Sequence, residues 1–169
     1  MATPDDPGWD TRPYLPLLER LRPGARLYFR LTANPTYSTF NRGTRGTRTA
    51  HTTPTHQLRW LLDRAPAAGF IIPALPHPEQ PEHHQVNVLA ARRLDFPRRH
   101  GDRRPAHVRI HTVTYEGHLE ITDPTALHRT LTHGLGRAKS YGCGLLTVAP
   151  TRADREARDS IQRREEAHP

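Results

Sequence analysis

The stretch Val108-Arg-Ile-His-Thr-Val-Thr-Tyr-Glu-Gly-His-Leu-Glu-Ile-Thr-Asp-Pro-Thr-Ala-Leu127 decides the fold. In its first half, apolar or β-branched residues take every second position, which is the period of a half-buried strand. Glu116-Gly117 interrupts this alternation, and Leu119 and Ile121 then resume it. A glycine between two alternating runs predicts a hairpin, with one strand on each side of Glu116-Gly117.

A helix is expected to follow this hairpin. Asp123 is a favourable N-cap, and Pro124 suits the first helical position because no amide hydrogen is needed there. Apolar and small residues then recur at helical spacing, and Gly134 is placed to end the helix. The buried side of the helix is predicted to hold Ala126, Leu127, Thr130 and Leu131.

Further elements lie on either side of this stretch. Apolar residues at every second position of Leu27–Leu31 predict a strand, and leucines at helical spacing predict a helix from Pro54 to near Gly69, with Thr53 or Thr55 as its N-cap. The apolar run 145–149 predicts a last strand, and weaker extended segments occur at 70–75 and 86–94. Strand, helix, hairpin, helix and strand together predict an α+β, ferredoxin-like (RRM-like) βαββαβ domain with a four-stranded antiparallel sheet.

The chain is predicted to form one folded domain, over residues 26–150. Residues 1–25 are rich in proline and predict a linker or a remnant arm, whereas residues 151–169 are charged and predict a disordered or helical tail. Residues 36–53 are rich in Thr, Gly and Arg without periodicity, so they predict a mobile basic loop. Trp60 and Phe29 fall in apolar patterns and are expected in the core.

The charge of the chain predicts a polyanionic partner. The formal net charge is +8, and phosphates that bind such a surface release condensed counterions, so nucleic acid is favoured over an anionic membrane surface. No apolar run is long enough to span a membrane and no secretory signal is recognised, which predicts a cytoplasmic protein. Cys143 is the lone cysteine, which excludes a disulfide within the chain and a cysteine-rich zinc site.

The segment Gly134-Leu-Gly-Arg-Ala-Lys-Ser-Tyr-Gly-Cys-Gly144 is the most informative for function. Glycines let backbone amides approach a phosphate closely, and Arg137 and Lys139 add charge-assisted bonds, so the segment has the chemistry of an anion cradle. The alternative is a packing role, in which the first two glycines end the helix and the last two allow close contact. The predicted binding residues of this segment are Gly134, Gly136, Arg137, Lys139, Ser140, Gly142 and Gly144.

Basic residues and histidines elsewhere complete the predicted site. Four side chains of the basic region 92–111 are expected to follow the phosphates of a nucleic-acid stem, with a solvated basic face as the alternative. These residues are Arg103, Arg104, Arg109 and His111. The 12 histidines show no metal-ligand spacing, so neither a metal nor another cofactor is predicted. His51 and His56 flank the first helix and are the candidates for proton transfer.

The glycine-rich segment resembles the one near the end of the CasE family, the endoribonucleases that process CRISPR repeat RNA in type I-E systems. Three further stretches are similar to signatures of that family, in the same order and at similar separations. They are LYFRLTANP at 27–35, HQLRWLL at 56–62 and VTYEGHLEITDPTAL at 113–127. The resemblance covers residues 24–150, and the glycine-rich segment together with the 113–127 stretch is its most specific part.

The resemblance implies two tandem ferredoxin-like domains, of which this chain matches the second. It also implies a protein that binds a CRISPR repeat hairpin, cuts it on the 3′ side without a metal, and stays in the Cascade complex with other subunits. A first-domain histidine of the family assists attack of the ribose 2′-hydroxyl on the adjacent phosphate. Only 26 residues precede the first strand here, so we expect that segment to be missing and cleavage to be impaired. An active ribonuclease and a non-catalytic structural RNA-binding subunit of Cascade are the alternatives.

Overall fold

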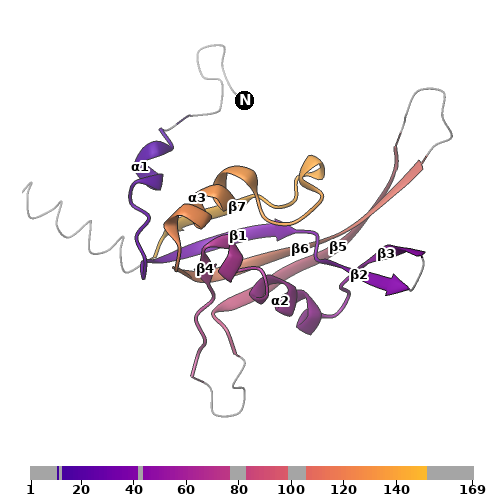
Figure 1. Cartoon of the computed structure of the whole chain (residues 1–169), viewed down its shortest axis with the longest axis horizontal. Coiled ribbons are helices and arrows are strands. Elements are labelled where there is room, and N and C mark those ends of the chain that lie inside the picture. Colours follow the sequence, from indigo (N-terminus) through magenta and orange to yellow (C-terminus); the bar gives the residue numbers. More distant parts are fainter. Residues whose placement is uncertain (1–10, 12, 42–43, 77–82, 99–105, 152–169) are drawn as a thin grey trace, which may run out of the picture.

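The computed structural model describes residue 11 and residues 13–41, 44–76, 83–98 and 106–151. Its main feature is an antiparallel sheet with helices on one face (Figure 1). The strands of this sheet are β1 (Arg26–Ala33), β4 (Phe70–Ile71), β5 (Val86–Arg98), β6 (Ala106–Ile121) and β7 (Leu146–Pro150). The remaining elements are the ribbon β2 (Thr36–Asn41) and β3 (Thr44–Ala50), the helices α1 (Leu15–Leu18), α2 (Pro54–Leu62) and α3 (Pro124–His133), and the short 3-10 helices η1 (Pro66–Ala68) and η2 (Lys139–Tyr141).

The strand order confirms the predicted α+β, ferredoxin-like fold. β1 pairs with β7 on one side and β6 on the other, and the outer edge of β6 pairs with both β4 and β5. β4 is opposite residues 120–121 of β6, whereas β5 is opposite residues 106–117. These two strands therefore share one position, and the order β7, β1, β6 and β4 with β5 is that of a βαββαβ unit with all pairs antiparallel.

The turn predicted at Glu116-Gly117 is wrong, because β6 continues without interruption from Ala106 to Ile121. A Cβ added to Gly117 would lie 2.1 Å from the carbonyl oxygen of Gln85, at the start of β5. Glycine is required at this position by the close approach of two backbones and not by a change of chain direction. The hairpin partner of β6 is instead β5, the segment that the sequence indicated only as weakly extended.

Alternation along the central strands places one side of the sheet in the core. Phe29 and Leu31 of β1 and Tyr115 of β6 are fully buried, while the residues between them point to the opposite, open face. Phe29 and Trp60, which is 3% exposed, confirm the predicted core positions. The other fully buried core side chains include Leu61, Phe70, Val113, Leu119, Ile121, Leu127 and Leu146.

α3 begins at its predicted cap, Asp123, and α2 begins at Thr53, one of its two candidate caps. The side chains of Thr53 and Asp123 accept hydrogen bonds from backbone amides of the first turns of α2 and α3, which satisfies donors that have no partner within the helix. α3 ends at Gly134, as predicted. α2 ends at Leu62, earlier than predicted, and η1 leads from there to Gly69, which has a left-handed backbone conformation.

Most of the predicted loop 36–53 forms a paired ribbon, over residues 36–41 and 44–50. β2 and β3 pair from Thr36 opposite Ala50 to Asn41 opposite Thr44, and the amide of His51 donates to the carbonyl oxygen of Pro35 at 3.0 Å to close the base of the ribbon. No described residue of the ribbon belongs to the hydrophobic core, and strands without a core face need no alternation of apolar and polar residues. This explains why the sequence showed no period of two here.

The end of the predicted linker 1–25 packs on the domain. Leu21 is 4% exposed and belongs to the core, and the amide of Gly24 donates to the carbonyl oxygen of Ile121 at 2.7 Å. The predicted tail lies outside the described residues, apart from residue 151. The domain limits therefore stay predictions.

Candidate nucleic-acid interface

Three features gather at the end of the sheet where β1 stops (Figure 1). Ala33, the last residue of β1, is opposite Val113, so β5 and the first part of β6 extend beyond β1 as a two-stranded arm. The β2–β3 ribbon follows β1 directly. β7 begins opposite Leu31, so the glycine-rich loop 134–144 before it also lies at this end. We call this part of the molecule the basic end.

The glycine-rich loop has a backbone that only glycine adopts readily. Gly134, Gly136, Gly142 and Gly144 all have positive φ, and so does Ala138 at 60°. Added Cβ atoms would come within 2.9 Å of backbone at Gly134 and 2.7 Å at Gly144, but would meet nothing at Gly142. The packing alternative therefore holds for Gly134, which ends α3, and for Gly144, whereas Gly142 meets nothing and Gly136 packs on Trp60 without ending a helix. Packing at the base of the loop is compatible with a binding role for the residues between Gly134 and Gly144.

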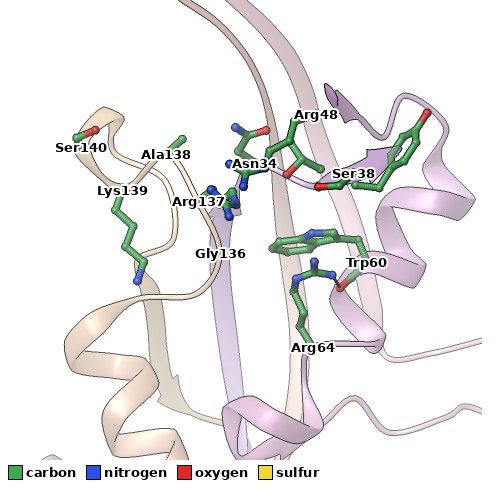
Figure 2. Close-up of a pocket in the computed structure, with 12 residues that line it drawn as sticks. Asn34, Ser38, Arg48, Trp60, Arg64, Gly136, Arg137, Ala138, Lys139 and Ser140 are labelled. Atoms are coloured by element: carbon green, nitrogen blue, oxygen red, sulfur yellow. Dashed lines mark hydrogen bonds between the residues drawn. The ribbon is translucent and has the colours of Figure 1, made fainter. Parts of the chain in front are cut away.

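The turn Gly136–Ser140 of this loop lines a cavity of about 760 Å³ (Figure 2). Its other walls come from the end of β1, the ribbon and the α2 region. The lining residues outside the loop are Asn34, Thr36, Tyr37, Ser38, Arg48, Trp60 and Arg64. Four of the lining residues are cationic and none is a carboxylate, so the cavity favours an anion.

Hydrogen bonding leaves the amides of this turn available. Leu135 and Gly144 tie the loop at its base, because the Leu135 amide donates to the Gly144 carbonyl and the Gly144 amide donates to the Thr32 carbonyl, both at 2.7 Å. Within the described part of the chain, the backbone amides of Gly136–Ser140 donate to no backbone carbonyl. Exposed amides next to cations are the groups that bind phosphate in backbone nests.

Trp60 and Arg64 form the floor of the cavity. The Arg64 guanidinium lies 4.5 Å from the centre of the Trp60 ring and donates to the Trp60 carbonyl oxygen at 3.2 Å. Trp60 in turn stacks on the buried Tyr115, with ring centres 6.4 Å apart and planes at 10°. Burial lowers the pKa of Arg64, but a guanidinium stays charged at neutral pH. The stack therefore holds one cation in a fixed orientation.

Asn34 contributes an unpaired acceptor to the cavity wall. Its Oδ1 atom is buried and has no hydrogen-bond partner among the described residues. A buried acceptor without a partner costs about 1–3 kcal/mol, so the wall of the cavity at Asn34 is not fully satisfied in its hydrogen bonding.

The two-stranded arm presents a polar face on the helix side of the sheet, the side of the cavity. Arg93 is opposite His111 and Asp95 is opposite Arg109, and these four residues share the side of the buried Val113. Asp95 accepts hydrogen bonds from His107 at 2.8 Å and Arg109 at 3.0 Å, and these two contacts lower the pKa of its carboxyl group. Arg109 is therefore already paired, whereas Arg93 forms no ion pair within the described residues.

His51 and His56 lie beside the cavity and do not line it. The His51 ring is 4.8 Å from Tyr37 and 5.8 Å from His56, measured between ring centres. His56 Nδ1 is within 2.9 Å of the Thr53 hydroxyl, a group that also caps α2. Burial, and then the nearby charges of His56 and Arg64, lower the pKa of His51.

The structure brings together part of the predicted site. Gly136, Arg137, Lys139 and Ser140 line the cavity, with Gly134 and Gly144 at the base of the loop, and Gly142 follows η2. Arg109 and His111 lie on the arm, and Arg103 and Arg104 lie outside the described residues. The sequence reasoning missed Asn34, Arg48, Arg64 and Arg93, and it placed Trp60 only in the core. A usable signal was the i, i+4 spacing of Trp60 and Arg64, which puts them on one helical face.

The part of the chain that the structure describes holds no group of three or more His, Cys, Asp or Glu side chains able to hold a metal ion. In the described segments, no helix has the length and apolar character needed to cross a membrane.

Comparison with known proteins identifies relatives over most of the chain. Residues 2–150 match the family model described as CRISPR associated protein. The chain is 35% identical over 139 residues to the CRISPR-associated endoribonuclease Cse3 of Thermus thermophilus, which covers 82% of this chain and 62% of Cse3. It is 31% identical over 139 residues to the CRISPR system Cascade subunit CasE of Escherichia coli, which covers 78% of this chain and 61% of CasE.

A solved structure shows that the fold is shared as well. The structure of CRISPR endoribonuclease Cse3 bound to a 19-nucleotide RNA matches with a TM-score of 0.62 and 36% identity, over 78% of this chain and 58% of Cse3. The chain thus spans about three fifths of the length of the relatives it matches. Sequence, fold and family model agree, and the chain belongs to the CRISPR-associated protein family, as a CasE (Cse3) member of the type I-E group.

Proposed function

We propose that this chain binds the hairpin of CRISPR repeat RNA at its basic end. The observation that carries this proposal is the cavity of about 760 Å³, which is lined by four cations, no carboxylate, and a loop turn whose amides donate to no backbone carbonyl among the described residues. The relatives support it, since one is an endoribonuclease with a structure bound to RNA and another is a Cascade subunit. We extend the partners accordingly to crRNA and the other subunits of a Cascade complex.

The geometry suits the backbone of an RNA stem. A-form RNA is recognised mainly through its shape, its phosphates and its 2′-hydroxyls, because side chains do not reach into its narrow major groove easily. In the proposed complex, the amides of Gly136–Ser140 and the side chains of Arg137 and Arg48 bind phosphates of one strand. Arg93 and His111 of the arm follow the stem beyond the cavity.

We propose further that cleavage by this chain alone is impaired. The family chemistry needs a group that moves a proton near neutral pH to activate the ribose 2′-hydroxyl. The residues that line the cavity include no histidine and no carboxylate, and the nearby His51 and His56 are turned to each other and to the cap of α2. Binding without cleavage also fits the alternative of a non-catalytic structural subunit of Cascade. A test of whether the chain assembles with the other Cascade subunits separates this alternative from an RNA-binding chain with impaired cleavage.

The test mixes the chain with a labelled repeat hairpin in EDTA and scores binding and cleavage on one gel over a salt series. We expect selective binding of the hairpin over unstructured RNA, with no product. The Arg137→Ala/Lys139→Ala variant should lower the slope of log K against log salt by about 1 for each lost phosphate contact. Arg26→Ala is the control, since Arg26 lies at the other end of β1 and pairs with Glu120 at 3.0 Å.

Each result has a defined meaning. A single cut at the 3′ base of the stem would contradict impaired cleavage and direct attention to His51→Ala and His56→Ala variants. Equal affinity for hairpin and random RNA would contradict hairpin recognition. An equal loss of affinity in the Arg26→Ala control would show that the overall charge matters and the cavity does not.

A further inference from the structure

A second hollow lies on the open face of the sheet, on the opposite side from the cavity. It has a volume of about 360 Å³. Its floor is a row of small side chains across three strands, because Thr32 of β1 is opposite Thr114 of β6, which is opposite Ala90 of β5. Small residues in the middle of a sheet face, with longer ones around them, create a depression. Its walls include Arg30, Leu89, Arg92, Leu94 and Tyr141.

Two arginines stand on opposite sides of this floor. Arg30 precedes Thr32 by two positions on β1, and Arg92 follows Ala90 by two positions on β5, so both point to the open face. Both are exposed, and no carboxylate lines the hollow. Glu116 is opposite Arg30, but it accepts a hydrogen bond from the Tyr28 hydroxyl, and this bond raises the pKa of Tyr28. Glu116 does not line the hollow, whose lining carries two cations and no carboxylate.

An aromatic side chain completes the hollow. Tyr141 is 38% exposed, and its ring centre lies 5.5 Å from that of Phe96 on β5. Tyr141 belongs to the same glycine-rich loop whose Gly136–Ser140 turn lines the cavity. One short loop thus contributes to two cationic recesses, one on each side of the sheet end.

We propose that this hollow binds a nucleotide of single-stranded RNA that continues from the bound hairpin. Arg30 and Arg92 bind its phosphates, Tyr141 stacks on its base, and the Thr32–Thr114 pair, whose hydroxyls are 2.9 Å apart, offers a hydroxyl to the sugar or base. An unpaired strand is favoured over a duplex because stacking on a tyrosine needs a base that is free of its neighbours. The volume of the hollow is also less than half that of the cavity, which suits one nucleotide better than a duplex.

This inference rests on the proposed RNA-binding function for the source of the strand, and its test separates the two. Three labelled RNAs are compared: the bare repeat hairpin, the same hairpin with a single-stranded flank of about six nucleotides on either side, and an oligouridylate of that length. The Arg30→Ala/Arg92→Ala variant should lose about tenfold in affinity for the flanked hairpin and the oligouridylate, while its affinity for the bare hairpin stays unchanged. The cavity variant Arg137→Ala/Lys139→Ala should show the opposite preference.

Further variants test the assignment of roles. Tyr141→Leu keeps an apolar contact with Phe96 but loses the stacking surface, so it should weaken binding of the oligouridylate, whereas Tyr141→Phe should not. Arg26→Ala removes one charge from the same strand and face at the far end of β1, and it should change none of the three affinities. Thermal unfolding of every variant shows that it is folded.

Two results would overturn the inference. In the first, the unmodified chain binds the flanked hairpin no more tightly than the bare hairpin and does not bind the oligouridylate. The second is an equal loss for bare and flanked hairpins in the Arg30→Ala/Arg92→Ala variant. If the unmodified chain binds oligouridylate through Arg30 and Arg92 but does not prefer the hairpin, then the hollow stands and the proposed hairpin recognition fails.

Discussion

The indole of Trp60 lies against the backbone of Gly136, so closely that a Cβ added at residue 136 would sit 3.0 Å from two ring atoms. This contact joins α2 to the glycine-rich loop and sets the width of the cavity between them. It also carries the first prediction, because Gly136 has a φ of 84° and therefore two reasons to be glycine.

Gly136→Ala should destabilise the fold and weaken RNA binding. An L side chain in the left-handed region costs about 1–2 kcal/mol, and the clash with Trp60 adds to this cost. Gly142→Ala is the matched control, since Gly142 has a φ of 80° but its Cβ would meet nothing within 4 Å. Urea unfolding and RNA titration of both variants check the prediction. Equal effects in the two variants would mean that the contact with Trp60 is unimportant.

Asp95→Asn should strengthen RNA binding severalfold. The carboxylate holds His107 and Arg109 on the arm, and its removal takes away a negative charge and releases Arg109 to bind a phosphate. The slope of log K against log salt should become steeper by about 1. A filter-binding titration at several salt concentrations measures both quantities, with Asp63→Asn on α2 as the control. Weaker binding would show that Asp95 is needed to orient the arm.

The stability of the fold should fall as the pH drops below 6.5, in part because of His51. Its pKa in the folded chain lies below the usual value of 6.5, so below that pH the unfolded chain binds more protons and is favoured. The effect ends once the pH falls below the folded pKa. His51 is only partly buried, so the contribution is modest. His51→Gln should flatten the pH dependence of the urea midpoint between pH 8 and 5, and an unchanged dependence would refute the assignment.

Gly117→Ala should be the most damaging of these substitutions. The new Cβ would lie 2.1 Å from the Gln85 carbonyl oxygen and 2.7 Å from the Val86 Cα, both of which are backbone atoms that cannot move aside alone. We expect a loss of more than about 2 kcal/mol in the free energy of unfolding, measured by urea denaturation. If Gly117 were instead in a hairpin turn, as the sequence suggested, alanine would meet no backbone atom and would cost only the strain of a positive φ, about 1–2 kcal/mol.

The parts of the fold that depend on local chemistry were predictable from the sequence. The cap at Asp123 and the end of α3 at Gly134 were predicted, and Thr53 was one of two candidate caps, because each involves groups within a few residues of one another. The turn at Gly117 was predicted wrongly, because a glycine that permits two strands to approach looks the same in sequence as a glycine that permits a turn.

The candidate site was predictable only where its signal is continuous in sequence. The glycine-rich loop showed its cations and glycines in eleven consecutive residues, whereas Arg48, Arg64 and Asn34 reach the cavity from three separate segments. Arg93 lies on the cavity side of the sheet because of the register of β5 against β6. A bulge between Val88 and Ala90 shifts this register and so decides which residues of β5 lie on which face. No pattern within the segment itself reveals that register.

The two hydrogen bonds of Gly144 have a consequence for the thermodynamics of binding. Its amide is held by Thr32 of the central strand and its carbonyl by Leu135, so the loop between them is closed before any ligand arrives. An RNA that enters the cavity therefore does not have to restrict a freely moving segment, and little conformational entropy is lost in the loop on association. Affinity gained in this way needs no additional contact, and it depends on a glycine at the base of the loop, outside the lining of the cavity.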